Sequence, residues 1–299
     1  MYKIGLFGYS YSGKTSIFKA ITGKTDDTYN PLRPNVGIGK FKDKILDEIV
    51  LTAKSEKTIY SEFEFFDFKG MPETTGFSDD YLKQLLETEL IIGVVKNYDE
   101  NSKPEQESTS LIMELVFFDI ARIEKLLSSN KGLLPQQIKI LETGLKLLEQ
   151  EKLLNTLDSK EIKILQGIEL LTIKPILIFI NGEEKPYTSQ LQHIKNNILE
   201  FDEEQFYANI IQRLSLTTFY TIKGKMSQSW LVSNTLNAKE SAGKVHKDIE
   251  KGFIRAAVVS YKDFLAMGDW QKVKSAGGLK FLGPNSKISD KDIVEFYFN

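Results

Sequence analysis

The sequence predicts an α/β core with a mainly parallel sheet, a helical insertion within that core, and a separate α+β domain at the C-terminal end. Three observations lead to this prediction. Apolar strand-like runs alternate with helical stretches over the N-terminal third and again near residue 175, which is typical of parallel sheets. Residues 111–169 contain almost no strand pattern. Beyond residue 214, short strand-like runs return between glycine-rich turns.

The elements of the core follow in chain order. Residues 3–8 form a short apolar run that ends in glycine, and residues 14–22 continue with helical spacing. Residues 62–68, 89–95 and 174–181 are apolar runs with β-branched or aromatic side chains, which favour buried strands. We therefore expect a parallel sheet built from these segments, with helices between them.

The insertion has the pattern of amphipathic helices. Asp158 and Glu161 form an N-cap signature for one of them. The insertion therefore predicts two or three helices, of which two could form an antiparallel coiled hairpin. An apolar stripe of this kind serves core packing or a partner-binding arm, and the sequence leaves both open. The residues that recur at spacings of three and four are Ile138, Leu141, Leu145 and Leu148.

The last part of the chain predicts a compact α+β domain of about 85 residues, long enough to fold alone. Residues 216–222, 252–259 and 293–298 are strand-like, and residues 238–249 are helical. From residue 215 onward there are 13 Lys and Arg against 8 Asp and Glu, whereas the remainder has 26 against 33. Either a module that faces nucleic acid or scattered surface charge explains this imbalance.

The composition excludes several classes of protein. The 299 residues leave room for about two domains. The chain has no Cys and two His, which excludes disulfides, thiolate zinc sites and a Cys nucleophile, and argues against a metal site built from His. Its apolar runs are far shorter than the roughly 20 residues of a membrane-spanning helix. Because the sequence opens in a strand pattern, we expect no signal peptide, no membrane association and a cytoplasmic location.

The strongest motif is a phosphate-binding loop at residues 8–15, which fits G-x-x-x-x-G-K-[ST] between a predicted strand and a predicted helix. Glycines let the backbone N–H groups converge on an anion, and the following helix adds its positive N-terminus. We expect Lys14 to reach the β- and γ-phosphates and the Thr15 hydroxyl to coordinate Mg²⁺. The predicted nucleotide-binding residues of this segment are Gly8, Tyr9, Ser10, Tyr11, Ser12, Gly13, Lys14, Thr15 and Ser16.

A second motif, D-x-x-G, begins at Asp67 and ends at Gly70, at the end of a predicted strand. In GTPase-like P-loop proteins the Asp holds Mg²⁺ and the Gly N–H meets the γ-phosphate. We therefore predict Thr15 and Asp67 as metal ligands. Lys14 and Gly70 are the predicted catalytic residues. Met71 stands where Ras-like enzymes place a water-orienting Gln, and because a thioether cannot orient water, we expect slow hydrolysis.

A third motif, N-x-x-E, ends another predicted strand at Asn181 and Glu184, where guanine-specific proteins carry N-K-x-D. The Asp of that motif accepts hydrogen bonds from guanine N1–H and N2–H₂. Here no Lys follows the Asn, and the acid at that spacing is the longer Glu184, so the motif argues against guanine selectivity. Asn181 and Glu184 are therefore the candidate base-binding residues, and a turn residue is the alternative for Asn181.

These motifs and the C-terminal residues resemble the YchF family of P-loop ATPases, also called Obg-like ATPases. The resemblance extends from Lys3 to Asn299. It is most specific in four stretches, which are residues 33–37 (R-P-N-V-G), 170–175 (L-L-T-I-K-P), 181–184 (N-G-E-E) and 246–256 (H-K-D-I-E-K-G-F-I-R-A).

The resemblance implies an architecture and an activity. Residues 1–110 and 170–214 would form a Ras-like P-loop NTPase core, and residues 111–169 a helical, coiled-coil insertion. Residues 215–299 would form a TGS domain with a β-grasp fold. The resemblance also implies hydrolysis of ATP in preference to GTP through N-x-x-E, with a hydrophobic residue at the position of Met71. It further implies Mg²⁺ as cofactor, stimulation by K⁺, and association with the ribosome or RNA through the helical arm and the TGS domain.

The sequence departs from the family pattern around the phosphates. The switch I Thr of the family aligns with Pro31, which has neither a hydroxyl nor an N–H, and Thr28 is out of register. Switch II is reduced to residues 72–76. Tyr9 and Tyr11 replace the usual P-loop residues and would pack over the nucleotide or on the protein. Two rivals to an ATPase switch stay open: a nucleotide-gated binding protein with little turnover, which Pro31 and Met71 motivate, and an Obg-like GTPase, against which the missing N-K-x-D argues.

Two residues of the TGS-like stretch have competing interpretations. His246 is interpreted as a structural histidine or as a functional residue. Arg255 is interpreted as an RNA contact or as a solvated surface residue. The sequence does not separate these alternatives.

Overall fold

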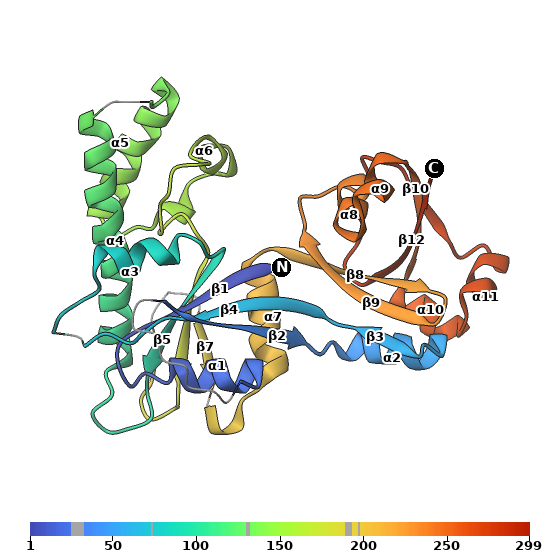
Figure 1. The fold of residues 1–299 in the computed structure, drawn as a ribbon, viewed down its shortest axis with the longest axis horizontal. Helices are drawn as coiled ribbons and strands as arrows, with labels where there is room; N and C mark the ends of the chain where they lie inside the picture. The colour runs from blue at the N-terminus through green and yellow to red at the C-terminus, as the bar shows by residue number, and fades with distance from the viewer. Residues whose placement is uncertain (25–32, 73, 130–131, 189–192, 197) are drawn as a thin grey trace. The chain divides into compact units, whose positions relative to one another are not determined.

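The computed structural model describes residues 1–24, 33–72, 74–129, 132–188, 193–196 and 198–299. Pro31 and Thr28, the switch I positions discussed above, lie outside the described residues. The chain divides into two compact units, labelled by element in Figure 1. The core unit comprises Met1–Gly39 and Phe63–Glu203, and the grasp unit comprises Lys40–Glu62 and Glu204–Asn299.

The core unit is built on a six-stranded sheet in the order β2-β4-β1-β5-β6-β7. The strand pairs β1–β4, β1–β5, β5–β6 and β6–β7 are parallel. Because parallel strands end at the same edge, the segments that follow β1, β4, β5 and β6 meet there. The strands of this sheet are β1 (Tyr2–Phe7), β2 (Asn35–Phe41), β4 (Ser61–Asp67), β5 (Leu90–Lys96), β6 (Ile176–Asn181) and β7 (His193–Asn196).

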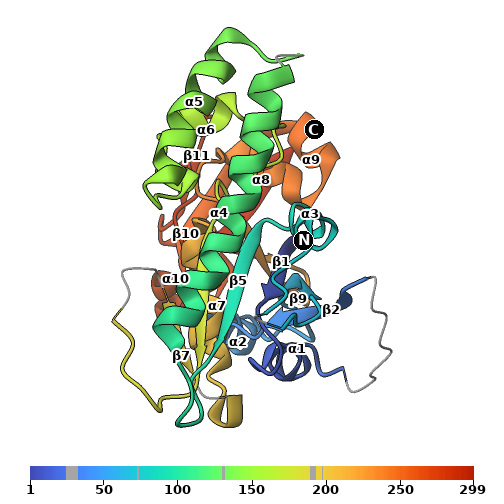
Figure 2. The ribbon, with the colours of Figure 1, turned by 90° about the vertical axis from the view of Figure 1, so that its left-hand side faces the viewer.

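Helices cover this sheet, and two of them, α4 and α5, run side by side as a helical hairpin (Figure 2). Leu141 and Leu148 of the predicted stripe are buried in the core cluster, which supports its interpretation as core packing. Asp158 caps α6 through a capping box with Glu161, as predicted. The helices are α1 (Lys14–Thr22), α3 (Asp79–Leu85), α4 (Pro104–Ser129), α5 (Pro135–Glu149) and α6 (Ser159–Ile164), with 3₁₀ turns at Leu154–Thr156 and Ile198–Glu200.

The return from the hairpin to the sheet is fixed by a buried carboxylate on α4. Asp119 accepts hydrogen bonds from the backbone N–H of Leu171 at 2.8 Å and from the N–H and hydroxyl of Thr172 at 2.7 and 2.6 Å. Burial raises the pKa of Asp119 to about 6. Lys174 donates to the carbonyls of Leu86 and Thr88. The stretch at residues 170–175 is thus a structural link between the hairpin and β6.

The grasp unit has a second six-stranded sheet, in the order β11-β10-β12-β8-β9-β3. β12 and β8 pair in parallel at its centre, and antiparallel neighbours flank them, which is the β-grasp arrangement. The predicted fold class, an α/β P-loop core with a C-terminal α+β β-grasp domain, is confirmed. The elements of this unit are α2 (Lys44–Ala53), β3 (Lys57–Ile59), α7 (Glu203–Arg213), β8 (Leu216–Lys223), β9 (Met226–Ser233), α8 (Ala238–Val245), α9 (Lys247–Lys251), β10 (Phe253–Ser260), α10 (Tyr261–Met267), α11 (Trp270–Ser275), β11 (Lys280–Leu282) and β12 (Asp292–Phe298).

The helical stretch predicted at residues 238–249 is confirmed, and the structure divides it into α8 and α9. His246 separates the two helices and caps α9, since its Nδ1 accepts from the N–H of Asp248 at 3.2 Å. This contact supports the structural interpretation of His246. The Arg255 guanidinium lies 4.3 Å from the ring centroid of Phe281 and 5.2 Å from that of Tyr297. None of the described helices is long and apolar enough to cross a membrane.

Candidate nucleotide-binding site

The predicted P-loop joins β1 to α1 and depends on two glycines. Gly8 and Gly13 adopt φ angles of 153° and 98°, which favour glycine. A Cβ atom on Gly8 would lie 2.5 Å from the carbonyl oxygen of Val94. A Cβ on Gly13 would lie 2.2 Å from Nδ2 of Asn181. Both positions therefore require glycine, for the conformation of the loop and for the close approach of neighbouring strand ends.

Lys14 is the buried cation of the site, with 4% of its surface exposed. Its Nζ donates to the carbonyl oxygen of Tyr9 at 2.6 Å and to Oγ of Ser12 at 3.3 Å. Burial lowers the pKa of Lys14 to about 8, although the carboxylates of Asp67 and Glu107 oppose this effect. The ammonium group is therefore held inside the loop, in an environment where the charge of a phosphate would be strongly attractive.

The D-x-x-G segment lies against the P-loop. The N–H of Ser10 donates to the carbonyl oxygen of Met71 at 2.9 Å. A Cβ on Gly70 would lie 2.9 Å from both Nζ of Lys14 and Cα of Ser10. The two predicted catalytic residues, Lys14 and Gly70, are thus brought together, and a side chain at position 70 would separate them.

The two predicted metal ligands are also neighbours. The Thr15 hydroxyl donates to Oδ2 of Asp67 at 2.9 Å, and Nδ2 of Asn35 lies 3.5 Å from the same oxygen. Oδ1 of Asp67 is buried and makes no hydrogen bond within the described residues. Burial raises the pKa of Asp67, while hydrogen bonds from Thr15 and Asn35 oppose that rise. An unpartnered carboxylate oxygen beside a hydroxyl suits a hard divalent cation such as Mg²⁺.

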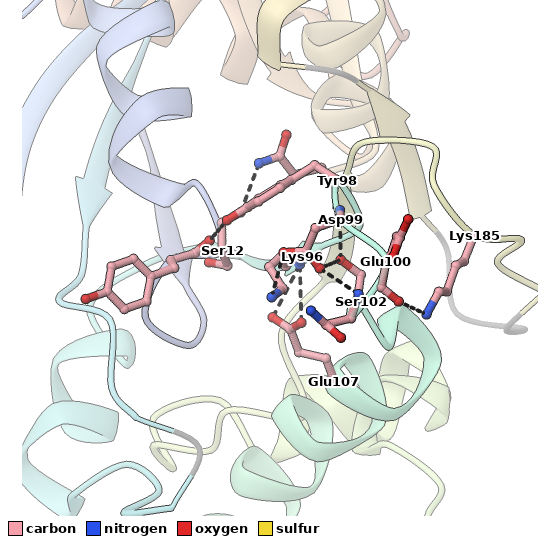
Figure 3. A network of polar contacts seen from close by, with 11 residues as sticks. Ser12, Lys96, Tyr98, Asp99, Glu100, Ser102, Glu107 and Lys185 are labelled. Atoms are coloured by element: carbon pink, nitrogen blue, oxygen red, sulfur yellow. Dashed lines mark hydrogen bonds and ion pairs between the residues drawn. The ribbon is translucent and has the colours of Figure 1, made fainter.

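The ends of β5 and β6 hold the outer side of the P-loop. Asn181, the last residue of β6, donates from Nδ2 to the carbonyl oxygen of Ser12 at 3.0 Å. Tyr98, two residues beyond β5, donates its hydroxyl to the carbonyl oxygen of Tyr11. Figure 3 shows the Tyr98 side chain extending to the loop in this way. Asn181 is buried, whereas Tyr98 is half-exposed at the rim.

A cavity of about 790 Å³ connects these groups. Glu184 is exposed and does not belong to its lining. Tyr9 lies behind the loop, where its ring stacks on Phe77 at 5.5 Å, whereas Tyr11 is 87% exposed. Of the open alternatives for the two tyrosines, Tyr9 therefore packs on the protein. The lining residues are Ser10, Tyr11, Gly13, Lys14, Thr15, Ser16, Lys69, Gly70, Tyr98, Asn181 and Ile198.

Sequence reasoning missed Tyr98, Lys69 and Ile198 as lining residues. Tyr98 could have been found, because the segment after β5 must reach the same sheet edge as the P-loop. Ile198 follows a short strand with little sequence pattern, and no motif marked it. Gly8 and Ser12, both predicted to bind nucleotide, lie outside the lining and shape the loop from behind.

Known proteins resemble this chain in sequence and in fold. Residues 216–299 match the family YchF-GTPase_C, described as "Protein of unknown function (DUF933)". A Mycoplasma genitalium protein named "Ribosome-binding ATPase YchF" is 26% identical over 369 residues, which cover 100% of both chains. A protein of the same name from Escherichia coli O157:H7 is 26% identical over 360 residues, covering 100% of this chain and 99% of that protein.

A solved structure, the YchF GTPase of Schizosaccharomyces pombe, shares the fold with a TM-score of 0.84 at 18% identity. The superposition covers 99% of this chain and 97% of that chain. The alignment with the M. genitalium protein has 369 positions against 299 residues here, so at least 70 of its positions have no counterpart in this chain.

Proposed function

We propose that the chain, which is similar over its whole length to proteins of the YchF family, is a P-loop ATPase that hydrolyses ATP to ADP and phosphate as a conformational switch. One observation carries the proposal. Lys14, Gly70 and Thr15 line the same cavity as Asn181 and Tyr98, and we assign the first three to the phosphate end of the site and the last two to its base end. This arrangement supplies a cation, a backbone N–H and a hydroxyl for a triphosphate at one end, and polar and aromatic side chains for a base at the other.

The phosphate end supports a charge-stabilising mechanism. Lys14 would leave its contacts with Tyr9 and Ser12 and stabilise the negative charge that develops on the transferred phosphoryl group. The N–H of Gly70 would orient the γ-phosphate. The Thr15 hydroxyl and the Asp67 carboxylate would hold Mg²⁺, which neutralises phosphate charge when it is bound. Release of the phosphate would free the D-x-x-G segment from the P-loop.

We propose ATP as the preferred nucleotide. Two relatives carry the name ATPase, whereas the similar solved structure is titled a GTPase. The N-x-x-E motif favours ATP, because it lacks the Lys and Asp that read guanine. Since Asn181 lines the cavity and Glu184 is exposed, we assign Asn181 the larger share of base binding and Glu184 the smaller. We also propose that K⁺ stimulates the hydrolysis of ATP.

The rival function is a nucleotide-gated binding protein with little turnover, and Met71 favours it. Its thioether cannot orient water, and its carbonyl oxygen is engaged with the N–H of Ser10.

In either case we propose the ribosome or RNA as the partner, through the α4–α5 hairpin and the β-grasp domain, because the relatives are named ribosome-binding.

A titration with fluorescent ATP and GTP analogues in Mg²⁺, followed by phosphate release on the same sample, tests the proposal. We expect tighter binding of ATP and multiple turnovers. Lys14→Ala should lower turnover to background, and Lys83→Ala, an exposed lysine of α3, is the matched control. A wild-type rate equal to that of Lys14→Ala would contradict the enzyme assignment. Binding without turnover would favour the gated binder, and tighter GTP binding the GTPase.

A further inference from the structure

Asn97, the residue that follows β5, directs all of its polar groups toward one neighbouring segment. It is 1% exposed. Its backbone N–H donates to the carbonyl oxygen of Asn181 at 2.8 Å, and its carbonyl oxygen accepts from the N–H of Glu184 at 3.0 Å. Residues 181 and 184 are the first and last positions of N-x-x-E. The backbone of Asn97 therefore spans the whole candidate base-binding motif.

The side chain of Asn97 makes further hydrogen bonds to the same segment. Its Nδ2 donates to the carbonyl oxygens of Gly182 and Lys185, at 3.3 and 2.9 Å. Its Oδ1 accepts from the N–H of Lys185 at 3.0 Å. A buried amide that is both donor and acceptor can satisfy this set of backbone groups, whereas a carboxylate or an apolar side chain cannot.

The contact between the two segments is also close in space. Gly182 has a φ of 105°, and a Cβ on it would lie 2.4 Å from the carbonyl oxygen of Asn97. The turn after β6 thus packs directly against the backbone of Asn97, and this close approach requires glycine at position 182.

The segment that carries Asn97 is itself well anchored, as Figure 3 shows. Lys96 pairs with Asp99 at 3.1 Å, and the Ser102 hydroxyl donates to Oδ1 of Asp99 at 3.0 Å. The N–H of Lys96 donates to the buried carboxylate of Glu107 at 3.3 Å. Lys185 adds a bond from its Nζ to the carbonyl oxygen of Glu100. These contacts hold Asn97 in place, and Asn97 in turn holds the turn that it binds.

We infer that Asn97 is a positioning residue that sets the selectivity of the site for its base by holding the Asn181–Lys185 segment; this inference rests on the proposed nucleotide-binding function. Asn181 both lines the cavity and donates to the carbonyl oxygen of Ser12. A shift of its segment moves this amide at the base end. The phosphate end, which is built from the P-loop and D-x-x-G, would lose the Asn181–Ser12 bond but would keep the contacts of Lys14 and of Thr15 with Asp67.

The test compares Asn97→Asp with Asn101→Asp, the same substitution at an exposed position of the same loop. The carboxylate of Asn97→Asp would face two carbonyl oxygens that now receive an N–H. We measure the dissociation constants of MgATP, MgGTP and magnesium tripolyphosphate, which has no base. We expect the ratio between the two nucleotides to move about tenfold toward unity, with tripolyphosphate binding changed less than about twofold. Asn97→Ala, which keeps the backbone bonds, provides a second variant should Asn97→Asp not fold.

Each result has a defined meaning. An unchanged nucleotide ratio in a folded Asn97 variant overturns the inference and leaves the proposed function intact. A parallel loss of tripolyphosphate binding also overturns it, because that loss indicates general damage. A wild-type protein that binds ATP and GTP equally overturns the selectivity role alone. A wild-type protein that binds neither nucleotide overturns the proposed function and this inference together.

Discussion

The phosphate end and the base end of the cavity are built in different ways. At the phosphate end, one stretch at residues 10–16 supplies most of the groups, and D-x-x-G supplies the rest. At the base end, Asn181, Tyr98 and Ile198 come from three segments that are distant in sequence. Recognition of phosphate depends on a backbone conformation that a short motif encodes. Recognition of the base depends on how the ends of β5 and β6 meet, which only the tertiary fold determines.

The largest effect should come from removing the cation of the phosphate end. Lys14→Ala deletes a buried ammonium group with charge-assisted contacts to phosphate, for which a loss of about 3 kcal/mol, or about 100-fold in ATP affinity, is expected. Affinities for ATP and GTP should fall together, because the base is not involved. Calorimetric titration of both nucleotides checks this, and a selective loss of ATP alone would contradict the separation of the two ends.

The substitution Gly13→Ala should affect the phosphate end and the base end together, because its new Cβ atom lies in the P-loop and meets Asn181. A Cβ there would meet Nδ2 of Asn181 at 2.2 Å, and φ is 98°. We expect a loss of about 2 kcal/mol, or about thirtyfold in nucleotide affinity. Gly23→Ala is the control, since Gly23 also has a positive φ but none of the described residues lies within 4 Å of its Cβ position. Equal losses in the two variants would show that backbone strain alone is responsible.

Removal of Mg²⁺ should act on the phosphate end only. Chelation is expected to weaken ATP binding about tenfold in the wild type. Asp67→Asn should lose most of this dependence, because an amide oxygen replaces the unpartnered carboxylate oxygen. Asp79→Asn, at an exposed position of α3, should keep it. The measurement is the ATP dissociation constant with and without EDTA, and full Mg²⁺ dependence in Asp67→Asn would count against Asp67 as a ligand.

The same contrast explains what the sequence could predict. The strands at residues 3–8 and 89–95 and the helix at 14–22 were recognisable from apolar runs and the P-loop pattern, and the structure confirms them. The Thr15–Asp67 contact followed from two motifs at neighbouring strand ends. These features depend on local sequence and on one rule about the edge of a parallel sheet.

The segment between β2 and β4 could not be predicted, because distant residues stabilise it. Leu46 and Ile49 of α2 are buried in a cluster with residues of β8, β10 and α10. β3 has three residues and exists by pairing with β9. Asp43 caps α2 and accepts a hydrogen bond from the hydroxyl of Tyr220 at 2.5 Å. No periodicity in so short a stretch indicates these partners.

At the base end, Tyr98→Phe should have a moderate effect. The hydroxyl of Tyr98 holds the carbonyl of Tyr11, and its loss should cost about 1 kcal/mol, or about fivefold in nucleotide affinity. Tyr98→Leu removes the ring as well. If the ring contacts the base, Tyr98→Leu should alter the ratio of ATP to GTP affinity, whereas Tyr98→Phe should leave that ratio unchanged. Identical ratios in both variants would limit Tyr98 to supporting the P-loop.

The smallest effect is expected at Glu184, although the motif alone marks it as a base reader. Its side chain is exposed and outside the cavity lining, so its carboxylate remains hydrated and any contact with a base would be weak. Its backbone N–H, by contrast, bonds to Asn97 and would survive substitution. Glu184→Ala should therefore change ATP affinity less than about twofold, as should the neighbouring control Glu183→Ala. A tenfold loss confined to Glu184→Ala would mean that ligand binding draws this carboxylate into the cavity, and that the motif encodes base recognition as locally as the P-loop encodes phosphate recognition.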